Sequence, residues 1–166
     1  MNKFFGKYRG KVVQNFDPEQ RGRILVEVPE VLGESQGWAM PCVPFAGQQS
    51  GFYAVPPPQA NVWVEFEKGD PDRPIWSGCF WTRGTTPGVA LAPPAPVPHI
   101  LMQTTAQNML HISDAPGPLG GIQLKTSSGA MILINDTGIT ITNGKGATIT
   151  LIGKIVDVNG GGLTVT

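Results

Sequence analysis

The chain has 166 residues, which is enough for one ordinary domain or two small ones. Its 12 basic residues balance its 12 acidic residues, and neither half carries the excess of lysine and arginine that a nucleic-acid-binding face requires. No run of 18 apolar residues occurs, so we predict no membrane-spanning helix. The N-terminal segment lacks the apolar core of a signal peptide, and we expect assembly in the cytoplasm.

The distribution of aromatic residues divides the chain into two halves. All aromatic residues lie between Phe4 and Trp81, and the last 85 residues contain none. Between the halves the sequence is rich in proline, and such a segment is extended and offers few backbone donors to a sheet. We therefore predict a first domain over residues 1–83, a linker over residues 84–98 and a second domain over residues 99–166.

The first domain alternates apolar and polar residues in short runs. Residues 23–28 and residues 61–67 are two predicted strands, and the turn-forming residues 68–74 lead from the second to a partner strand over residues 75–81. Three apolar side chains of the second strand share one face: Val62, Val64 and Phe66. Five or six such strands in about 80 residues predict a small closed barrel.

The second half of the chain contains an internal repeat. Residues 122–134 and residues 139–151 share a pattern of two short strands joined by a glycine-containing corner, at a shift of 17 residues. An earlier copy begins at Ile100 at a shift of 22, and its five extra residues fall in an inserted loop at residues 115–121. A further copy begins at Val156. The repeat predicts a β-solenoid, in which each unit contacts only its neighbours.

Alternate residues of the repeated strands are apolar, and we predict that they point toward a common core. The predicted core residues are Ile122, Leu124, Ile132, Ile134, Ile139, Ile141, Ile149, Leu151, Val156 and Val158. The intervening threonines are predicted to face water. They are Thr140, Thr142, Thr148 and Thr150.

A single copy of this half has little core to bury. Each strand contributes only two modest side chains, worth roughly 25 cal/mol per Å² of apolar area. Ordering the backbone costs about 1–2 kcal/mol per residue. Three identical chains around one axis would share a core and remove the open sheet edges. We therefore predict an all-β homotrimer.

Several segments of the first half match, in order, a known family. They are residues 10–13, 17–18, 22–29, 38–39, 44–47, 62–70 and 74–78. Over residues 6–81 the chain resembles the phage baseplate assembly protein V domain, the OB-fold of tail spikes and of the valine-glycine repeat spikes of type VI secretion. Residues 99–166 resemble the triple-stranded β-helix of the same family. The resemblance implies a trimer in which an OB-fold barrel is followed by a β-helical needle.

The resemblance implies a structural function, as the central spike of a contractile injection system. In the family, three barrels sit on the hub protein that ends the tail tube, and sheath contraction drives the needle into a target membrane. It also implies a PAAR-type tip protein at the C-terminal end, and a final location in the baseplate of a phage tail or injection particle. We expect the tip protein to contact Leu163, Thr164, Val165 and Thr166.

Two features that some family members possess are absent from this sequence. A lysozyme domain separates barrel and helix in some phage members, but here only the proline-rich segment lies between them, so no cell-wall hydrolase is implied. Other members end in a metal-binding His-x-His apex. The two histidines here, His99 and His111, do not have that arrangement, and we expect them to be surface or corner residues.

Few other residues suggest metal or catalytic chemistry. Cys42 and Cys79 show no zinc-ligand spacing and are predicted to be small buried apolar side chains. Asp70 and Asp72 belong to a Gly-Asp-Pro-Asp-Arg-Pro run, which is typical of a turn rather than of paired catalytic carboxylates. The glycines at residues 144–146 precede no helix, so we interpret them as a corner and not as a phosphate loop. We predict no cofactor, no metal and no enzymatic activity.

The leading alternative is an OB-fold module that binds nucleic acid or oligosaccharide, with the repeated half as a stalk. Trp38, Trp63, Trp76 and Trp81 would then form a stacking platform. Because basic residues to hold phosphates are scarce, we predict instead that these side chains pack in the core or between subunits, and that no nucleic acid binds. A third interpretation, a polysaccharide hydrolase, lacks the clustered carboxylates that such enzymes use.

Overall fold

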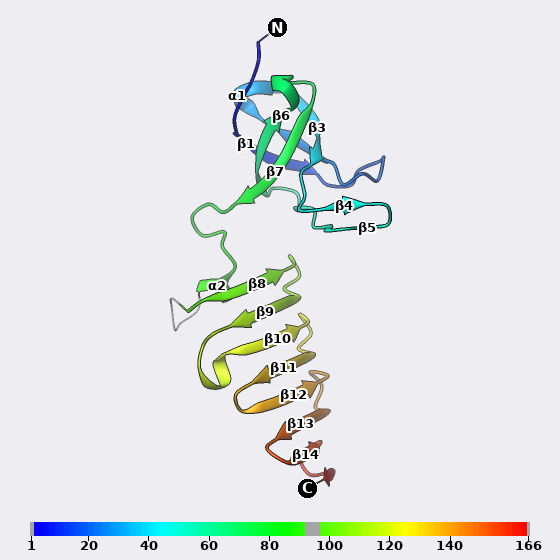
Figure 1. Cartoon of the computed structure of the whole chain (residues 1–166), viewed down its shortest axis with the longest axis vertical. Coiled ribbons are helices and arrows are strands. Elements are labelled where there is room, and N and C mark those ends of the chain that lie inside the picture. Colours follow the sequence, from blue (N-terminus) through cyan, green and yellow to red (C-terminus); the bar gives the residue numbers. More distant parts are fainter. Residues whose placement is uncertain (1, 92–96, 166) are drawn as a thin grey trace. The chain divides into compact units, whose positions relative to one another are not determined.

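The chain folds into two units, Met1–Thr85 and Thr86–Thr166. The computed structural model describes residues 2–91 and 97–165 (Figure 1). Strands make up most of the regular structure in both units, and the two α-helices, α1 and α2, have only four residues each. The predicted all-β class is confirmed.

The proline-rich segment between the halves is described only in part. Residues 92–96 of the predicted linker lie outside the described residues, as does Thr166, which we expected to contact a tip protein. Before that gap, the short helix α2 (Gly88–Leu91) interrupts the segment that we predicted to be extended. The other short helix, α1 (Pro29–Leu32), follows the second strand of the first unit, and proline opens it at a position where no backbone donor is needed.

The first unit contains a closed five-stranded barrel, as the alternating runs predict. Its strands are β1 (Tyr8–Gln14), β2 (Ile24–Glu27), β3 (Gln36–Pro41), β6 (Asn61–Phe66) and β7 (Pro74–Phe80). Their order around the barrel is β1-β2-β3-β7-β6. Strands β3 and β7 run parallel, with Met40 opposite Ile75, and the other neighbours are antiparallel.

Alternate side chains of the barrel strands fill its interior. Val62, Val64 and Phe66 lie on the buried face of β6, as predicted. The other members of the core are Val12, Ile24, Val26, Val28, Ala39 and Trp76. A Cβ atom at Gly10 would lie 2.8 Å from a methyl group of Val64, so β1 passes too close to β6 there for a larger residue.

A buried ion pair organises the loop between β1 and β2. The carboxylate of Asp17 accepts hydrogen bonds from the backbone N–H groups of Glu19 at 2.9 Å, Arg21 at 2.8 Å and Arg23 at 3.2 Å. The Arg23 guanidinium donates from Nε and Nη2 to Oδ1 of Asp17 at 3.1 and 2.8 Å. This guanidinium lowers the pKa of Asp17, and the backbone hydrogen bonds act in the same direction.

The turn between β6 and β7 has the structure that its sequence predicts. It begins with the short 3-10 helix η1 (Glu67–Gly69), in which Lys68 adopts a positive φ of 54°. The backbone N–H of Asp72 then donates to Oδ1 of Asp70 at 3.1 Å, and the N–H of Arg73 donates to the Asp70 carbonyl at 3.0 Å. The Asp70 side chain therefore stabilises a turn.

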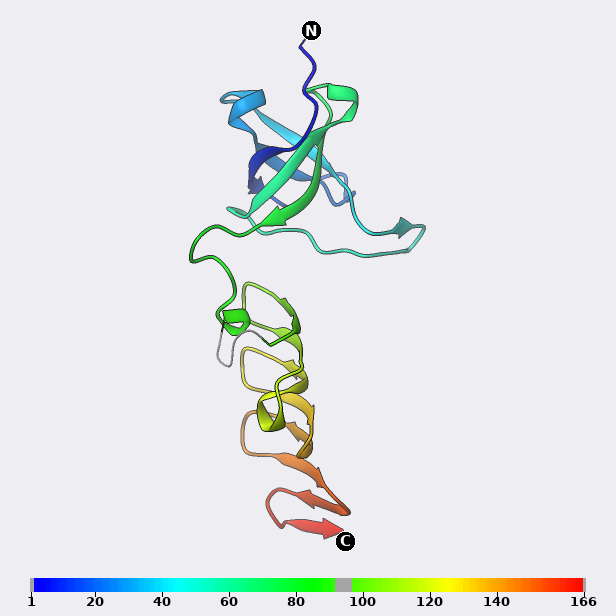
Figure 2. The same ribbon diagram turned by 60° about the vertical axis from the view of Figure 1, so that its left-hand side comes forward.

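The second unit is one eight-stranded antiparallel sheet. Its strands are β8 (His99–Gln103), β9 (Met109–Ser113), β10 (Gly121–Lys125), β11 (Met131–Asn135), β12 (Gly138–Thr142), β13 (Thr148–Ile152), β14 (Ile155–Val158) and β15 (Leu163–Val165). Each strand pairs with the next one in sequence, so the strands follow chain order across the sheet (Figure 2). The 3-10 helix η2 (Gly117–Leu119) lies in the inserted loop between β9 and β10.

The repeated strands form a meander within the single chain. Each corner reverses the direction of the chain, so consecutive strands pair with each other and one chain forms a meander, not a closed solenoid. Two corners contain only two residues each: Asp136 and Thr137 join β11 to β12, and Gly153 and Lys154 join β13 to β14. Such short connections join neighbouring antiparallel strands and leave no length for a crossover.

Two glycines lie where neighbouring strands pass too close for a side chain. Gly121 and Gly138 adopt positive φ angles of 92° and 144°, which side chains rarely tolerate. A Cβ atom at Gly121 would collide with the carbonyl oxygen of Ile134, and one at Gly138 would collide with that of Leu151. Each of these carbonyls belongs to a neighbouring strand, so the glycines are required by strand spacing as well as by backbone angle.

Candidate assembly surface

One face of the β8–β15 sheet presents only apolar side chains, and we call it the apolar face. Its described members are Ile100, Met102, Leu110, Ile112, Ile122, Leu124, Ile132, Ile134, Ile139, Ile141, Ile149, Leu151, Val156, Val158 and Leu163. The register sets them directly opposite one another: Leu124 faces Ile132, and Ile132 faces Ile141 on the next strand. All ten residues that we predicted to form a core belong to this face.

Most of the apolar face is uncovered in a single chain. Ile100 is 62 % exposed and Leu124 is 48 % exposed, although aliphatic side chains of sheets are usually buried on one face. Monomeric proteins rarely expose a contiguous apolar patch of more than a few hundred Å², and larger patches mark interaction sites. The apolar face runs over eight strands, so it is a candidate interaction surface.

The opposite face is less exposed than we predicted. Thr140, Thr142, Thr148 and Thr150 are half-buried rather than fully exposed to water. Their register explains this, because Thr140 lies between Leu133 and Thr150 on the adjacent strands. A short side chain flanked by neighbours on both sides is partly shielded, whereas the longer side chains of the apolar face extend beyond their own neighbours.

Two histidines lie together on that opposite face. The rings of His99 and His111 are 5.6 Å apart between centroids, at an angle of 75°. Desolvation lowers the pKa of His111, and the neighbouring His99 lowers it further. Among the residues that the structure describes, no group of three or more His, Cys, Asp or Glu side chains could hold a metal ion.

Hydrogen bonds between successive corners tie the strands into a rigid stack. At one end of the strands, the side-chain Oδ1 of Asn108 accepts from the backbone N–H of Ser127 at 3.0 Å. At the opposite end, the N–H of Gly117 donates to Oδ2 of Asp136 at 3.2 Å, which fastens the inserted loop to the next corner. Sequence reasoning missed these bonds. Their one available signal was the recurrence of asparagine and aspartate at the corners.

The last strand of the sheet leaves one backbone edge open. Within the described part of the chain, β15 pairs only with β14, where Val158 lies opposite Leu163. Leu163 is 60 % exposed. An open strand edge with an exposed apolar side chain favours pairing with another chain. The tip contact that we predicted for residues 163–166 would fall on this edge.

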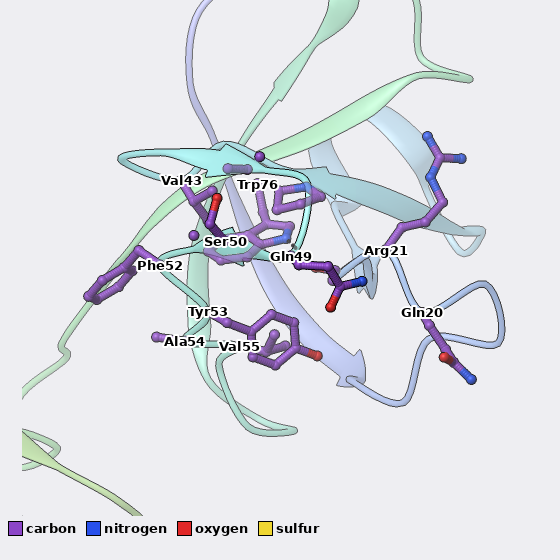
Figure 3. Close-up of a pocket in the computed structure, with 15 residues that line it drawn as sticks. Gln20, Arg21, Val43, Gln49, Ser50, Phe52, Tyr53, Ala54, Val55 and Trp76 are labelled. Carbon is purple, nitrogen blue, oxygen red and sulfur yellow. Dashed lines mark hydrogen bonds between the residues drawn. The ribbon is translucent and has the colours of Figure 1, made fainter.

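The first unit carries a second feature, a long connection between β3 and β6 that we call the arm, residues 42–60. It contains a small hairpin of β4 (Ala46–Gly47) and β5 (Ser50–Gly51). A cavity of about 500 Å³ lies between the arm and the barrel (Figure 3). Trp76 lines it, and its indole Nε1 donates to the Gly22 carbonyl at 3.3 Å.

The tryptophans do not share one exposed platform. Trp76 belongs to the barrel core, whereas Trp81 is largely exposed. Trp63 packs against Phe80 with 4.6 Å between ring centroids, and the Arg9 guanidinium lies over both rings. The stacking surface of this pair is therefore already occupied within the chain, which gives no support to a base-stacking site.

The two cysteines do not occupy the positions that we predicted. Cys42 and Cys79 are free thiols, and both are exposed, so the expectation of small buried side chains is wrong. Cys42 begins the arm just beyond β3, and Cys79 lies opposite Val62 but on the outer side of the barrel.

No described helix has the length and apolar character needed to cross a membrane.

Each of the two units matches a known protein family. Residues 8–81 match the type VI secretion system/phage-baseplate injector OB domain, and residues 99–164 match the phage baseplate V C-terminal trimerisation domain. The actin cross-linking toxin VgrG1 of Vibrio cholerae serotype O1 is 44 % identical over 57 residues, which are 34 % of this chain and 5 % of that protein. The match thus spans only a small part of that relative.

The two family matches follow one another along the chain as the barrel and the sheet do. The first covers all five barrel strands, from β1 to β7. The second covers the sheet whose apolar face is uncovered in a single chain, and the matched family is described as a trimerisation domain. The chain therefore belongs to the phage baseplate V family of injector spike proteins.

Proposed function

We propose that the protein is the central spike of a phage-tail-like contractile injection system and acts as a homotrimer. The observation that carries this proposal is the uncovered apolar face of β8–β15, within a segment that matches a trimerisation domain. Its role is mechanical: three copies form a stiff projection beyond the end of the tail tube, and contraction of the system drives it into the target envelope. This role needs no catalytic group.

Three copies can cover their apolar faces by turning them toward a common axis. Each sheet then forms one side of a three-sided prism, the triple-stranded β-helix that we expect for residues 99–166. Completing the burial of an isoleucine or leucine that is about two-fifths exposed is worth about 1 kcal/mol. Each exposed aliphatic side chain of the apolar face would contribute a gain of this size in each chain, and their sum supports a stable trimer.

The stacked corners suit a spike that must transmit force along its length. Every described strand from β9 to β14 is hydrogen-bonded on both sides, and the corner bonds of Asn108 and Asp136 join successive turns. A force along the stack must therefore break many backbone hydrogen bonds together. The match to an injector OB domain supports a position for the barrel at the hub or tube-end protein of the baseplate.

We also propose that a PAAR-type tip protein covers the open edge of β15. The contact would combine backbone pairing along β15 with apolar burial of Leu163, because the edge exposes both. The spike and its tip would assemble in the cytoplasm and remain in the baseplate of the phage tail or injection particle. They would contact the target membrane only during firing.

Particle isolation tests the proposed function. An epitope-tagged chain is produced in cells that make it naturally, and tail-like particles are collected by sedimentation and labelled for electron microscopy. The wild-type chain should sediment and label the baseplate end. The Leu151→Asp chain should stay in the supernatant, because it cannot trimerise, while Thr142→Asp should sediment normally. Absence of the wild-type chain from every sedimenting particle would contradict the proposal.

A further inference from the structure

The arm of the first unit is an apolar surface without charge. Residues 35–64, which include the whole arm, contain no Asp, Glu, Lys, Arg or His. Three aromatic side chains of the arm are exposed: Phe45 at 61 %, Phe52 at 47 % and Tyr53 at 79 %. Exposed aromatic residues with depleted charge are the composition found at the centres of protein interfaces.

The cavity beneath the arm has the same character. It is lined by apolar side chains, among them Val43, Val55 and Trp76, and by the uncharged polar side chains of Gln20, Gln49 and Ser50 (Figure 3). The one charged side chain in its lining is Arg21, whose Nη1 already pairs with Glu19 at 3.1 Å. A single charged side chain is too few to hold a nucleic acid, which is bound through many phosphate contacts. The surface fits an uncharged protein partner.

Chain connectivity indicates which partner is nearest. Strand β7 ends at Phe80 and β8 begins at His99, so 18 residues join the barrel to the sheet. These residues can span at most about 60 Å. In a trimer, three barrels are thus tethered to one axis, at an effective concentration on the order of 1 mM. Even a weak contact between barrels would be populated at that concentration.

We propose that, in the trimer, the arm of each barrel packs against the barrel of a neighbouring copy of the same chain. The contact covers Phe45, Phe52 and Tyr53, and the cavity beneath the arm receives uncharged side chains of the neighbour. In each contact, the arm of one copy meets a different surface, the barrel of the next copy. Around a common threefold axis, three such contacts close a ring. This contact rests on the proposed homotrimer, since it requires several copies in one particle.

Site-specific photo-crosslinking in the full-length chain, purified alone, tests this contact. Benzoylphenylalanine replaces Phe52 in one variant and the more exposed Tyr53 in a second, in case the first does not fold. The matched control carries the same group at the exposed Asp72. This residue belongs to the turn between β6 and β7, which lies away from β4 and β5 in Figure 1. Irradiation of either arm variant should yield covalent dimers and trimers on a denaturing gel. The control should assemble in the same way but give only the band of a single chain on that gel.

Light scattering of the same samples separates the two proposals. A trimeric sample in which the arm variants give only single-chain bands overturns the arm contact and leaves the homotrimer intact. A monomeric sample overturns the homotrimer and with it the proposed function. The crosslinked fraction should not change on tenfold dilution, because the copies belong to one particle. A fraction that falls with dilution reveals contact between separate particles and overturns the arm contact.

Discussion

Ile141 of β12 lies directly opposite Ile149 of β13, and both side chains project from the same uncovered face of the sheet, 41 % and 39 % exposed. The adjacent pair, Thr142 opposite Thr148, projects from the other face. One residue step along either strand therefore separates a side chain that three copies would bury from one that they would leave at the surface.

This alternation predicts opposite outcomes for two neighbouring substitutions. Ile141→Asp should abolish the trimer, because it places three unpaired carboxylates near one axis and burial of each costs several kcal/mol. Thr142→Asp, one residue away, should leave the trimer intact. Light scattering of the purified chains measures the difference. If Thr142→Asp proved as harmful as Ile141→Asp, the assignment of the two faces would be reversed.

The corner glycine Gly138 should be essential to the sheet. Gly138→Ala combines a positive φ, which costs of order 1–3 kcal/mol for other residues, with a collision against the Leu151 carbonyl oxygen. Gly146→Ala is the matched control, since Gly146 also has a positive φ, of 105°, but has open space around it. Thermal unfolding followed by circular dichroism should show a clearly larger loss for Gly138→Ala, and equal losses would disprove the role of the collision.

The ion pair of Asp17 with Arg23 should make the stability of the barrel depend on pH. Folding lowers the pKa of Asp17 from its ordinary value of 3.8, so its contribution is complete above that value and is lost as the pH falls toward the lowered pKa. All four tryptophans lie in the first unit, so their fluorescence reports on the barrel alone.

Asp17→Asn should therefore lower the melting temperature of the barrel at pH 7. The gap between variant and wild type should narrow as the pH drops below about 4. Asp72→Asn, at an exposed position in the turn between β6 and β7, serves as the control and should change the melting temperature little. A gap that stayed constant down to the lowest pH would show that the charge of Asp17 is not what stabilises the loop.

Removal of the last strand should separate assembly from tip binding. Deletion of residues 162–166 removes β15 but leaves seven strands and most of the apolar face, so the truncated chain should still form a trimer by light scattering. It should no longer retain a PAAR-type tip protein in a pull-down, because β15 and its exposed Leu163 are lost. Retention of the tip by the truncated trimer would place the tip contact elsewhere.

The period-two alternation of each strand was readable from the sequence. It correctly grouped Val62, Val64 and Phe66 on the buried face of β6, and it grouped the ten predicted core residues on one face of the sheet. Both groupings follow from local geometry, because successive side chains of any strand point to opposite sides. The closed barrel followed in the same way from the number and spacing of its strands.

Pairing partners and exposure were decided by the tertiary structure. The repeat alone did not reveal that each corner reverses the chain, so that one copy forms an antiparallel meander. Cys42 and Cys79 were predicted to be buried but are exposed. The side-chain bond from Asn108 to the Ser127 backbone also joins residues that are 19 positions apart. Alternation is set by bonds within a few residues, whereas burial and pairing depend on which distant segments meet, and no local pattern encodes that.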